Sequence, residues 1–258
     1  NTNSIDEINK TLRSISTLGS IQCYVLLLSL FRNREMLDIS MDEIKEIVQR
    51  MESFIFTYHT VCRKPANTVE KYYSELAVGI NKFGMDDDSR ARLRSRIAEL
   101  NVKWGDLWPN QQEFVDKFCS IKYSNSKSAK KKIRYILTKI DNHHHPRQNS
   151  EISINENISI EHLLPQNPRN WHMTQEEISE YVHLIGNLLL VGIPINSEAS
   201  NLALEQKVEK LCQSRIQTTV EIINKIKDRN SLYWSLNDIE ERGRELATLA
   251  YSDIWRRN

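Results

Sequence analysis

The feature that most constrains the fold is a helical period that runs through residues 4–140. Apolar residues recur there every three or four positions, for example from Ile5 to Ile15 and from Ile44 to Ile55. Such spacing places apolar side chains on one face of an α-helix. The chain holds only 7 Gly and 6 Pro among its 258 residues, so few residues interrupt helices. We therefore expect a helical bundle over this part of the chain.

In the C-terminal half the apolar pattern changes. Residues 152–164 alternate between apolar and polar side chains, and residues 188–193, LLLVGI, form a short apolar run. Both patterns are typical of β-strands. Helices are expected over 174–186, after a Thr-x-x-Glu capping box, and then over 198–214 and 237–255. The predicted fold is therefore mainly α with a small β-hairpin.

A polar segment that contains Pro146 separates the two patterns. Residues 141–150, DNHHHPRQNS, are typical of a domain boundary or an exposed loop. We expect an α-helical domain over residues 1–145 and a second domain over residues 146–258.

Overall charge gives no reason to expect a polyanionic partner, because the net charge is only +1. One local basic run stands out: KSAKKKIR, residues 127–134. It is either a solvated helix face or a patch that contacts phosphates. Its candidate phosphate contacts are Lys130, Lys131, Lys132 and Arg134.

The four cysteines form no C-x-x-C pair, which favours free thiols in a reducing compartment. The longest apolar run, residues 24–31, is much shorter than the roughly 20 residues of a membrane span. The sequence begins with Asn-Thr-Asn and shows no signal peptide. We expect a cytoplasmic protein with no membrane partner, and a sequence that is a piece of a longer protein.

The candidate chemistry lies in residues 158–207, where polar side chains stand in or beside apolar runs. Glu161 and His162 are adjacent near the end of the first expected strand, and several asparagines follow. Carboxylate and carboxamide oxygens suit Mg²⁺, and a neutral histidine can deprotonate a water at physiological pH. Hydrolysis of a phosphodiester needs these groups. The pattern therefore favours a hydrolytic metal site over a redox site.

This region resembles an HNH (ββα-metal) nuclease, and more narrowly the C-terminal nuclease module of GmrSD and SspE-type restriction proteins. The resemblance rests on IEHLLPQ at 160–166, HLIGNLLLV at 183–191 and SNLALEQK at 200–207. Further similar pieces are Trp171 and residues 56–77, 195–196 and 239–255. The resemblance implies an α-helical domain, serving as a spacer and a DNA-binding surface, followed by an HNH nuclease domain.

The resemblance also implies roles for individual residues. His162 matches the general base that activates water, and Asn187 matches an asparagine that holds the imidazole in the right tautomer and orientation. His183 and Gln166 look like supporting positions. Lys207 is a candidate phosphate contact, so we expect DNA contacts from Lys207 as well as from the basic run.

The metal site that the resemblance implies binds a divalent ion, Mg²⁺ or alternatively Mn²⁺. Its candidate ligands are Glu161 and, around the start of the following helix, Asn196 or Asn201, a choice that the sequence leaves open. Many HNH sites have Asp or His where this chain has Glu161. On an ideal strand Glu161 and His162 point to opposite faces. Joint action on one ion would therefore require a twist or a bulge in the strand.

Two hypotheses follow. The first is a metal-dependent DNA endonuclease or nickase that acts on double-stranded DNA as the effector part of a modification-related, anti-phage restriction protein. The second is a DNA-binding or partner-docking module whose nuclease site is inactive. The N-terminal NTP-hydrolysing and recognition portion of the family, with its DGQQR-type motif, is absent from these residues. We expect it elsewhere in the same protein.

Overall fold

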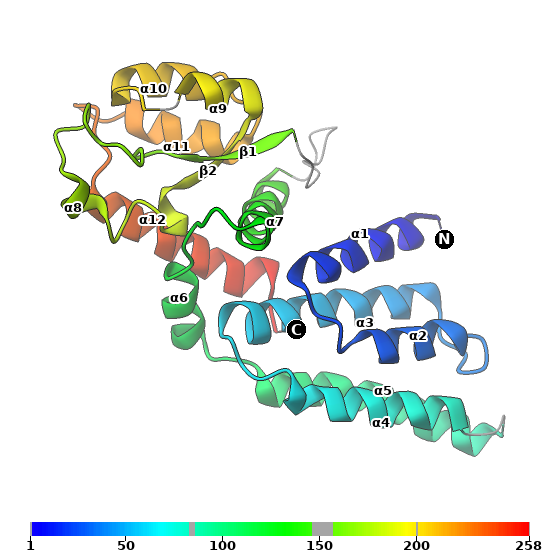
Figure 1. Cartoon of the computed structure of the whole chain (residues 1–258). Helices are drawn as coiled ribbons and strands as arrows, with labels where there is room; N and C mark the ends of the chain where they lie inside the picture. Colours follow the sequence, from blue (N-terminus) through cyan, green and yellow to red (C-terminus); the bar gives the residue numbers. More distant parts are fainter. Residues whose placement is uncertain (1, 83–85, 146–156, 200, 258) are drawn as a thin grey trace. The chain divides into compact units, whose positions relative to one another are not determined.

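The computed structural model describes residues 2–82, 86–145, 157–199 and 201–257 (Figure 1). These residues are mainly helical and contain one two-stranded antiparallel sheet, which confirms the predicted mainly α fold with a small β element. None of the helices among them combines the length and the apolar character that crossing a membrane requires.

The chain divides into two compact units. Unit 1 comprises Asn1–Phe114 and Trp255–Asn258, and unit 2 comprises Val115–Ile254. This division lies before the boundary expected after residue 145. Helix α7 (Lys127–His144) belongs to unit 2 because it packs against both strands of the sheet.

The first residues of the segment expected to be a loop are helical. Asp141–His144 form the last turn of α7, and His145 N donates to Asp141 O at 3.0 Å. The rest of that segment, residues 146–150, and the first part of the expected strand, residues 152–156, lie outside the described residues.

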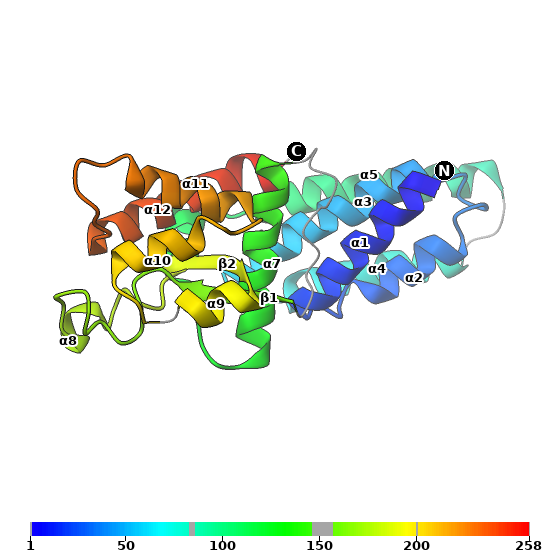
Figure 2. The same ribbon diagram turned by 90° about the horizontal axis from the view of Figure 1, so that it is seen from above.

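Unit 1 has a helical core, as the apolar period predicts. Its helical elements are α1 (Thr2–Leu18), α2 (Tyr24–Arg32), α3 (Met41–Phe54), the π-helix η1 (Ile55–Val61), α4 (Asn67–Lys82) and α5 (Asp87–Leu107). Helix α1 packs against α3, and α2 packs against α4 (Figure 2). The centre is aromatic: the rings of Phe54 and Tyr58 stack with centroids 4.8 Å apart, and Phe54 stacks on Trp104 at 6.0 Å.

Unit 2 is built around the sheet (Figure 1). Strand β1 (Ile158–His162) pairs antiparallel with β2 (Leu188–Gly192), and His162 lies opposite Leu188. The remaining elements are α6 (Gln111–Cys119), which begins in unit 1, α8 (Gln175–Ile178), the 3₁₀ turn η2 (Ile185–Asn187), α9 (Ile193–Ala199), α10 (Leu204–Leu211), α11 (Gln217–Lys227), α12 (Leu236–Leu249) and the π-helix η3 (Ala250–Ile254). Helices α7 and α9 pack against both strands, and α11 packs against β2.

The helix expected over 174–186 is much shorter than predicted. Its capping box is present, but α8 has only four residues. Farther along, Tyr123 N donates to His183 O at 2.8 Å, and Ile185 N donates to Ile121 O at 3.0 Å. These bonds hold the chain extended beside a neighbouring segment, so the helix cannot continue.

The helix expected over 198–214 is interrupted and forms α9 and α10. Between them, Trp171 Nε1 donates to Leu202 O at 3.0 Å, and Asn170 Nδ2 donates to Asn201 O at 3.1 Å. Side chains therefore take the carbonyl oxygens that a continuous helix would have bonded to its own N–H groups.

Helix α12 fixes the start of β2. A Cβ atom on Gly186 would clash with the carbonyl oxygen of Ile239, so only glycine permits this close approach. Gly186 therefore serves helix packing, and not the end of a long helix as we expected. Arg242 Nη1 donates to Gly186 O at 2.6 Å and to Leu188 O at 2.9 Å. Burial lowers the pKa of Arg242 to about 10, and the side chain stays bonded to both carbonyls.

Candidate active site around His162

His162 ends strand β1, and the alternation of the strand decides what it faces. Successive side chains point to opposite faces of a strand. Glu161 pairs with Lys207 of α10, whereas His162 contacts His183. Pairing with β2 is continuous through both residues, so no bulge turns Glu161 toward the imidazole.

The imidazole of His162 lies between two polar side chains and an aromatic ring. Its Nε2 is 3.2 Å from His183 Nδ1, and its Nδ1 is 3.3 Å from Gln166 Nε2. The ring of Tyr123 meets the imidazole edge to face, with centroids 4.8 Å apart. His162, His183, Gln166 and Tyr123 are called the histidine cluster below. Gln166 is exposed, so Nδ1 is the ring nitrogen on the solvent side.

The surroundings keep His162 neutral. Burial, followed by the charges of His183 and Lys207, lowers the pKa of His162 to about 3. A neutral imidazole has a lone pair that can accept a proton, but a base with such a low pKa is weak. An anion bound beside the ring would favour its charged form and raise the pKa. The site therefore suits a base that becomes stronger once an anionic group is bound.

A buried ion pair behind His162 involves two residues that we expected to take part in binding. Lys207 Nζ lies 2.6 Å from Glu161 Oε1 and donates to His162 O at 2.5 Å. The Lys207 side chain has no exposed surface, so it cannot contact DNA as we expected. The carboxylate of Glu161, which we expected to bind a metal ion, forms an ion pair with this ammonium. Burial raises the pKa of Glu161 and lowers that of Lys207, and the attraction of each partner opposes both shifts.

Asn187 holds the chain that follows β1 and does not orient the imidazole as expected. Its Nδ2 donates to Leu164 O and to Val182 O, both at 2.8 Å. Its Oδ1 accepts from Leu164 N at 2.8 Å and from Trp234 Nε1 at 3.3 Å. A carboxamide offers two donor and two acceptor positions, and all four are used. Asn187 therefore positions the backbone two residues after His162.

Asn196 is the oxygen donor that best suits a cation. Its Oδ1 is buried and has no hydrogen-bond partner among the described residues, and its helix α9 packs against β1. The alternative, Asn201, is exposed. In the part of the chain that the structure describes, no group of three or more His, Cys, Asp or Glu side chains could hold an ion. Asn196 fits Mg²⁺ if water and substrate supply the other ligands, as Mg²⁺ commonly requires.

The basic run lies on α7 and reaches the histidine cluster. Lys130 Nζ lies 5.7 Å from the centroid of the Tyr123 ring, in cation–π geometry. Lys131 is exposed, and Lys132 and Arg134 are partly exposed. The sequence predicts these side chains on one helix, and the structure adds that the first part of the run lies beside Tyr123.

Sequence reasoning missed Tyr123 and Arg242. Tyr123 precedes α7 in a short segment with no strong pattern, so no signal in the sequence connects it to His162. Arg242 follows Ile239 by three residues on an amphipathic helix, a spacing that puts its side chain on the apolar face. That position is the signal that could have indicated a buried arginine.

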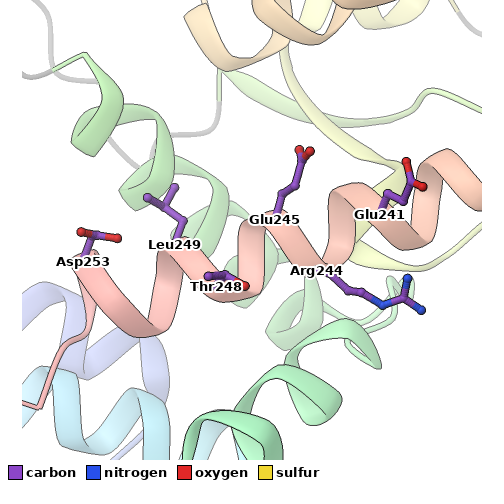
Figure 3. A pocket seen from close by; sticks show the side chains of 6 residues that line it. All are labelled: Glu241, Arg244, Glu245, Thr248, Leu249 and Asp253. Carbon is purple, nitrogen blue, oxygen red and sulfur yellow. The ribbon is translucent and has the colours of Figure 1, made fainter.

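A hollow of about 640 Å³ lies elsewhere in unit 2 (Figure 3). Its lining residues are Glu241, Arg244, Glu245, Thr248, Leu249 and Asp253. They come from successive turns of α12 and η3, so they do not converge from separate elements. The lining contains no member of the histidine cluster, and we do not assign the candidate site to this hollow.

The comparison with known families gives a clear result. A sequence model described as the C-terminal domain of GmrSD restriction endonucleases matches residues 108–249, more than half of the chain. The chain belongs to this family. The resemblance to GmrSD restriction proteins drawn from residues 160–207 is thereby confirmed. The GmrSD C-terminal match also begins before Tyr123 and α7, so the histidine cluster and the basic run lie wholly within it. Among curated proteins, no sequence matches the chain.

Proposed function

We propose that this GmrSD C-terminal domain is an HNH-type DNA endonuclease or nickase that hydrolyses phosphodiester bonds. The observation that carries the proposal is His162, a buried neutral imidazole at the end of β1 whose Nδ1 lies beside the exposed Gln166. Membership in a restriction endonuclease family supports a nuclease. The order of β1, β2 and then the short helices α9 and α10 supports a ββα arrangement.

In this mechanism His162 takes a proton from the attacking water at Nδ1, once Gln166 moves aside. The phosphate of the substrate raises the pKa of the imidazole and so strengthens the base. Hydrogen bonds hold the backbone at His162 and just after it. Lys207 donates to His162 O, and Asn187 bonds both the N–H and the C=O of Leu164. These contacts keep the imidazole in place during the proton transfer.

The proposed cofactor is a divalent cation, Mg²⁺ or Mn²⁺. When bound, it would stabilise the negative charge on the leaving oxygen. Asn196 Oδ1 is the protein oxygen that would hold it, because this buried atom has no hydrogen-bond partner among the described residues. Glu161 stays paired with Lys207 in this proposal and serves the structure of the site.

Double-stranded DNA is the proposed partner of the basic run. Lys130 lies beside Tyr123, which contacts His162, so phosphates bound along α7 would lead toward the imidazole. Arg134, four residues after Lys130, extends this surface along the helix, and the exposed Lys131 flanks it. Each neutralised phosphate releases counterions, and we therefore expect DNA affinity to fall steeply with salt.

Plasmid cleavage with a panel of divalent metals tests the proposal. We expect the wild-type chain to nick or cut DNA with Mg²⁺ or Mn²⁺. His162→Ala should lower the rate by about 100-fold or more, in the range that general-base catalysis contributes. Asn196→Ala should raise the metal concentration needed for half-maximal rate. Lys210→Met, in the half-exposed pair of Lys210 with Glu198, is the matched control and should leave the rate unchanged. Full activity in His162→Ala would refute the proposal.

A second candidate is a DNA-binding or partner-docking module whose nuclease site is inactive. The pairing of Glu161 with Lys207 favours it, because the ammonium already binds the carboxylate of the residue next to His162. Salt-dependent DNA binding by the wild-type chain, with no cleavage under any divalent metal, would support this candidate. Charge reversal at Lys130–Lys132 should then abolish binding, and unchanged binding would reject the basic run as the DNA surface.

We further propose that the domain is the effector of a modification-related, anti-phage restriction protein. In this view an N-terminal NTP-hydrolysing and recognition portion of the same protein controls when the domain cuts. Family membership supports this role. The test compares phage plating on cells that express the full-length protein with plating on cells that express its His162→Ala variant. Equal plating on both would contradict it.

A further inference from the structure

Two side chains contact the imidazole of His162: His183, so far only a supporting position, and Tyr123, which has no assigned role. We propose that His183 and Tyr123 are positioning residues, and that His183 fixes the His162 tautomer that carries its ring hydrogen on Nε2. This inference rests on the proposed function of His162 as the base. It gives to His183 the orienting task that the sequence assigned to Asn187.

The contact between the two histidines indicates which ring nitrogen of His162 carries the hydrogen. His162 Nε2 and His183 Nδ1 are 3.2 Å apart, so one of them donates a hydrogen bond and the other accepts it. A base that accepts a proton at Nδ1 must already carry its hydrogen on Nε2. That hydrogen points at His183 Nδ1, and His183 is therefore the acceptor. The arrangement of nucleophile, base and orienting group in hydrolases uses the same logic.

The opposite side of the imidazole is consistent with this assignment. Gln166 Nε2 is 3.3 Å from His162 Nδ1, and an amide nitrogen can only donate. Nδ1 is then the nitrogen whose lone pair accepts a hydrogen bond, on the side where the exposed Gln166 can be replaced by water. Both ring nitrogens therefore have one consistent assignment, with Nε2 as donor and Nδ1 as acceptor.

Tyr123 holds His183 in turn. Its backbone N donates to His183 O at 2.8 Å, and Lys122 forms a β-bridge with Leu184. Its ring lies nearly parallel to the His183 ring, at 21° and 6.0 Å, and nearly perpendicular to the His162 ring, at 84° and 4.8 Å. One aromatic ring thus limits the rotation of both imidazoles. The hydroxyl donates away from them, to Asn125 Oδ1 at 3.2 Å, so the ring carries the effect and not the hydroxyl.

Nitrogen NMR of the histidine rings tests the tautomer directly. We expect the wild-type protein at neutral pH to show His162 with its hydrogen on Nε2. His183→Leu should produce a mixture of both tautomers, and His183→Asn, which keeps an acceptor near the position of Nδ1, should restore the Nε2–H form. A wild-type His162 with its hydrogen on Nδ1 would overturn the inference without any variant, so loss of folding in a variant cannot hide the answer.

Cleavage kinetics test the consequence. We expect His183→Leu and Tyr123→Leu to lower kcat by about 10–100-fold, the range found for residues that orient the histidine ligands of metal sites. KM for DNA should change little, because neither residue is proposed to bind the substrate. Tyr123→Phe should regain most of the loss, since the ring remains. Wild-type kcat in both leucine variants would overturn the inference. If the wild-type chain cuts no DNA, the proposed function fails, and the NMR result alone decides the orientation of His162.

Discussion

The two units fill their cores with different chemistry. In unit 1 the core is apolar and aromatic, and Glu52 is the one buried acidic or basic side chain among its described residues. Unit 2 is about as large but buries several charged groups. These are Asp141, Glu161, Lys207, Asp238 and Arg242.

The difference follows from how each unit satisfies its backbone. The helices of unit 1 bond their own N–H and C=O groups, so their side chains need only pack. Unit 2 has two strands of five residues, whose ends and connections leave carbonyl oxygens without strand partners. Side chains fill these positions: Lys207 donates to His162 O, Arg242 to the start of β2, and Thr219 Oγ1 to Leu190 O at 2.7 Å. The buried cations Lys207 and Arg242 therefore replace missing backbone partners.

The largest effect is expected from breaking the buried ion pair of unit 2. Lys207→Met removes the ammonium and leaves Glu161 buried without its partner. We expect the free energy of unfolding to fall by about 3–5 kcal/mol. Chemical denaturation, with hydrogen exchange followed separately in each unit, measures the loss and should place it in unit 2.

Two further variants separate the pair from the rest of α10. Replacing both partners, with Glu161→Leu and Lys207→Met together, should recover much of the stability, because no unpaired charge remains. Lys210→Met, in the half-exposed pair with Glu198, should change the stability by less than about 1 kcal/mol. Equal losses in Lys207→Met and Lys210→Met would show that burial does not govern these pairs.

A smaller effect is expected from acid, and again in unit 2. The pKa of His162 falls from an ordinary 6.5 to about 3 in the folded chain. Below pH 6.5 the imidazole of His162 binds a proton more readily in the unfolded chain than in the folded chain. The contribution of neutral His162 to the free energy of unfolding is therefore complete above pH 6.5 and is lost as the pH falls toward 3. At pH 5 we expect unit 2 to be about 2 kcal/mol less stable than at pH 7. His162→Gln should flatten this dependence, and an identical pH profile in the variant would contradict the assignment to His162.

The smallest effect is expected in the core of unit 1. Trp104 Nε1 donates to the hydroxyl of Tyr73 at 2.8 Å, and both side chains are buried. Tyr73→Phe keeps the ring and removes the acceptor, at a cost of about 1 kcal/mol. The loss should be independent of pH between 5 and 7. Tyr72→Phe, at a partly exposed hydroxyl that donates to Arg96 O, is the control and should have a smaller effect. A larger loss at pH 5 than at pH 7 would show that the two cores do not differ in the way described.

Much of the fold could be predicted from the sequence because apolar spacing is a local property. The period of the N-terminal part predicted helices, and the alternating and apolar runs predicted the two strands. The errors lie where backbone groups that we expected to bond within a helix instead form hydrogen bonds with a segment distant in the sequence. Residues 183–185 pair with residues 121–123, and Asn201 and Leu202 give their carbonyls to Asn170 and Trp171. No local pattern reports such bonds.

The candidate site shows the same limit in its side chains. The motif indicated His162 and His183, and the structure brings them together. The motif could not show that Asn187 bonds only backbone groups and Trp234, because a motif does not say what a side chain faces. Lys207 was predicted as a DNA contact, although its spacing with Leu204 and Leu211 already placed it on the apolar face of α10. A charged residue at an apolar position is a clue to a buried partner.

The bond from Arg242 to the start of β2 also has a consequence for protein synthesis. The ribosome makes both strands and the histidine cluster before it makes α12, so Gly186 O and Leu188 O first meet their guanidinium donor late in translation. A nascent chain that stops before residue 236 lacks this support and the helix that packs against Gly186. The arrangement around His162 is thus completed only when nearly all of unit 2 has left the ribosome, and prematurely terminated chains lack the fully assembled site.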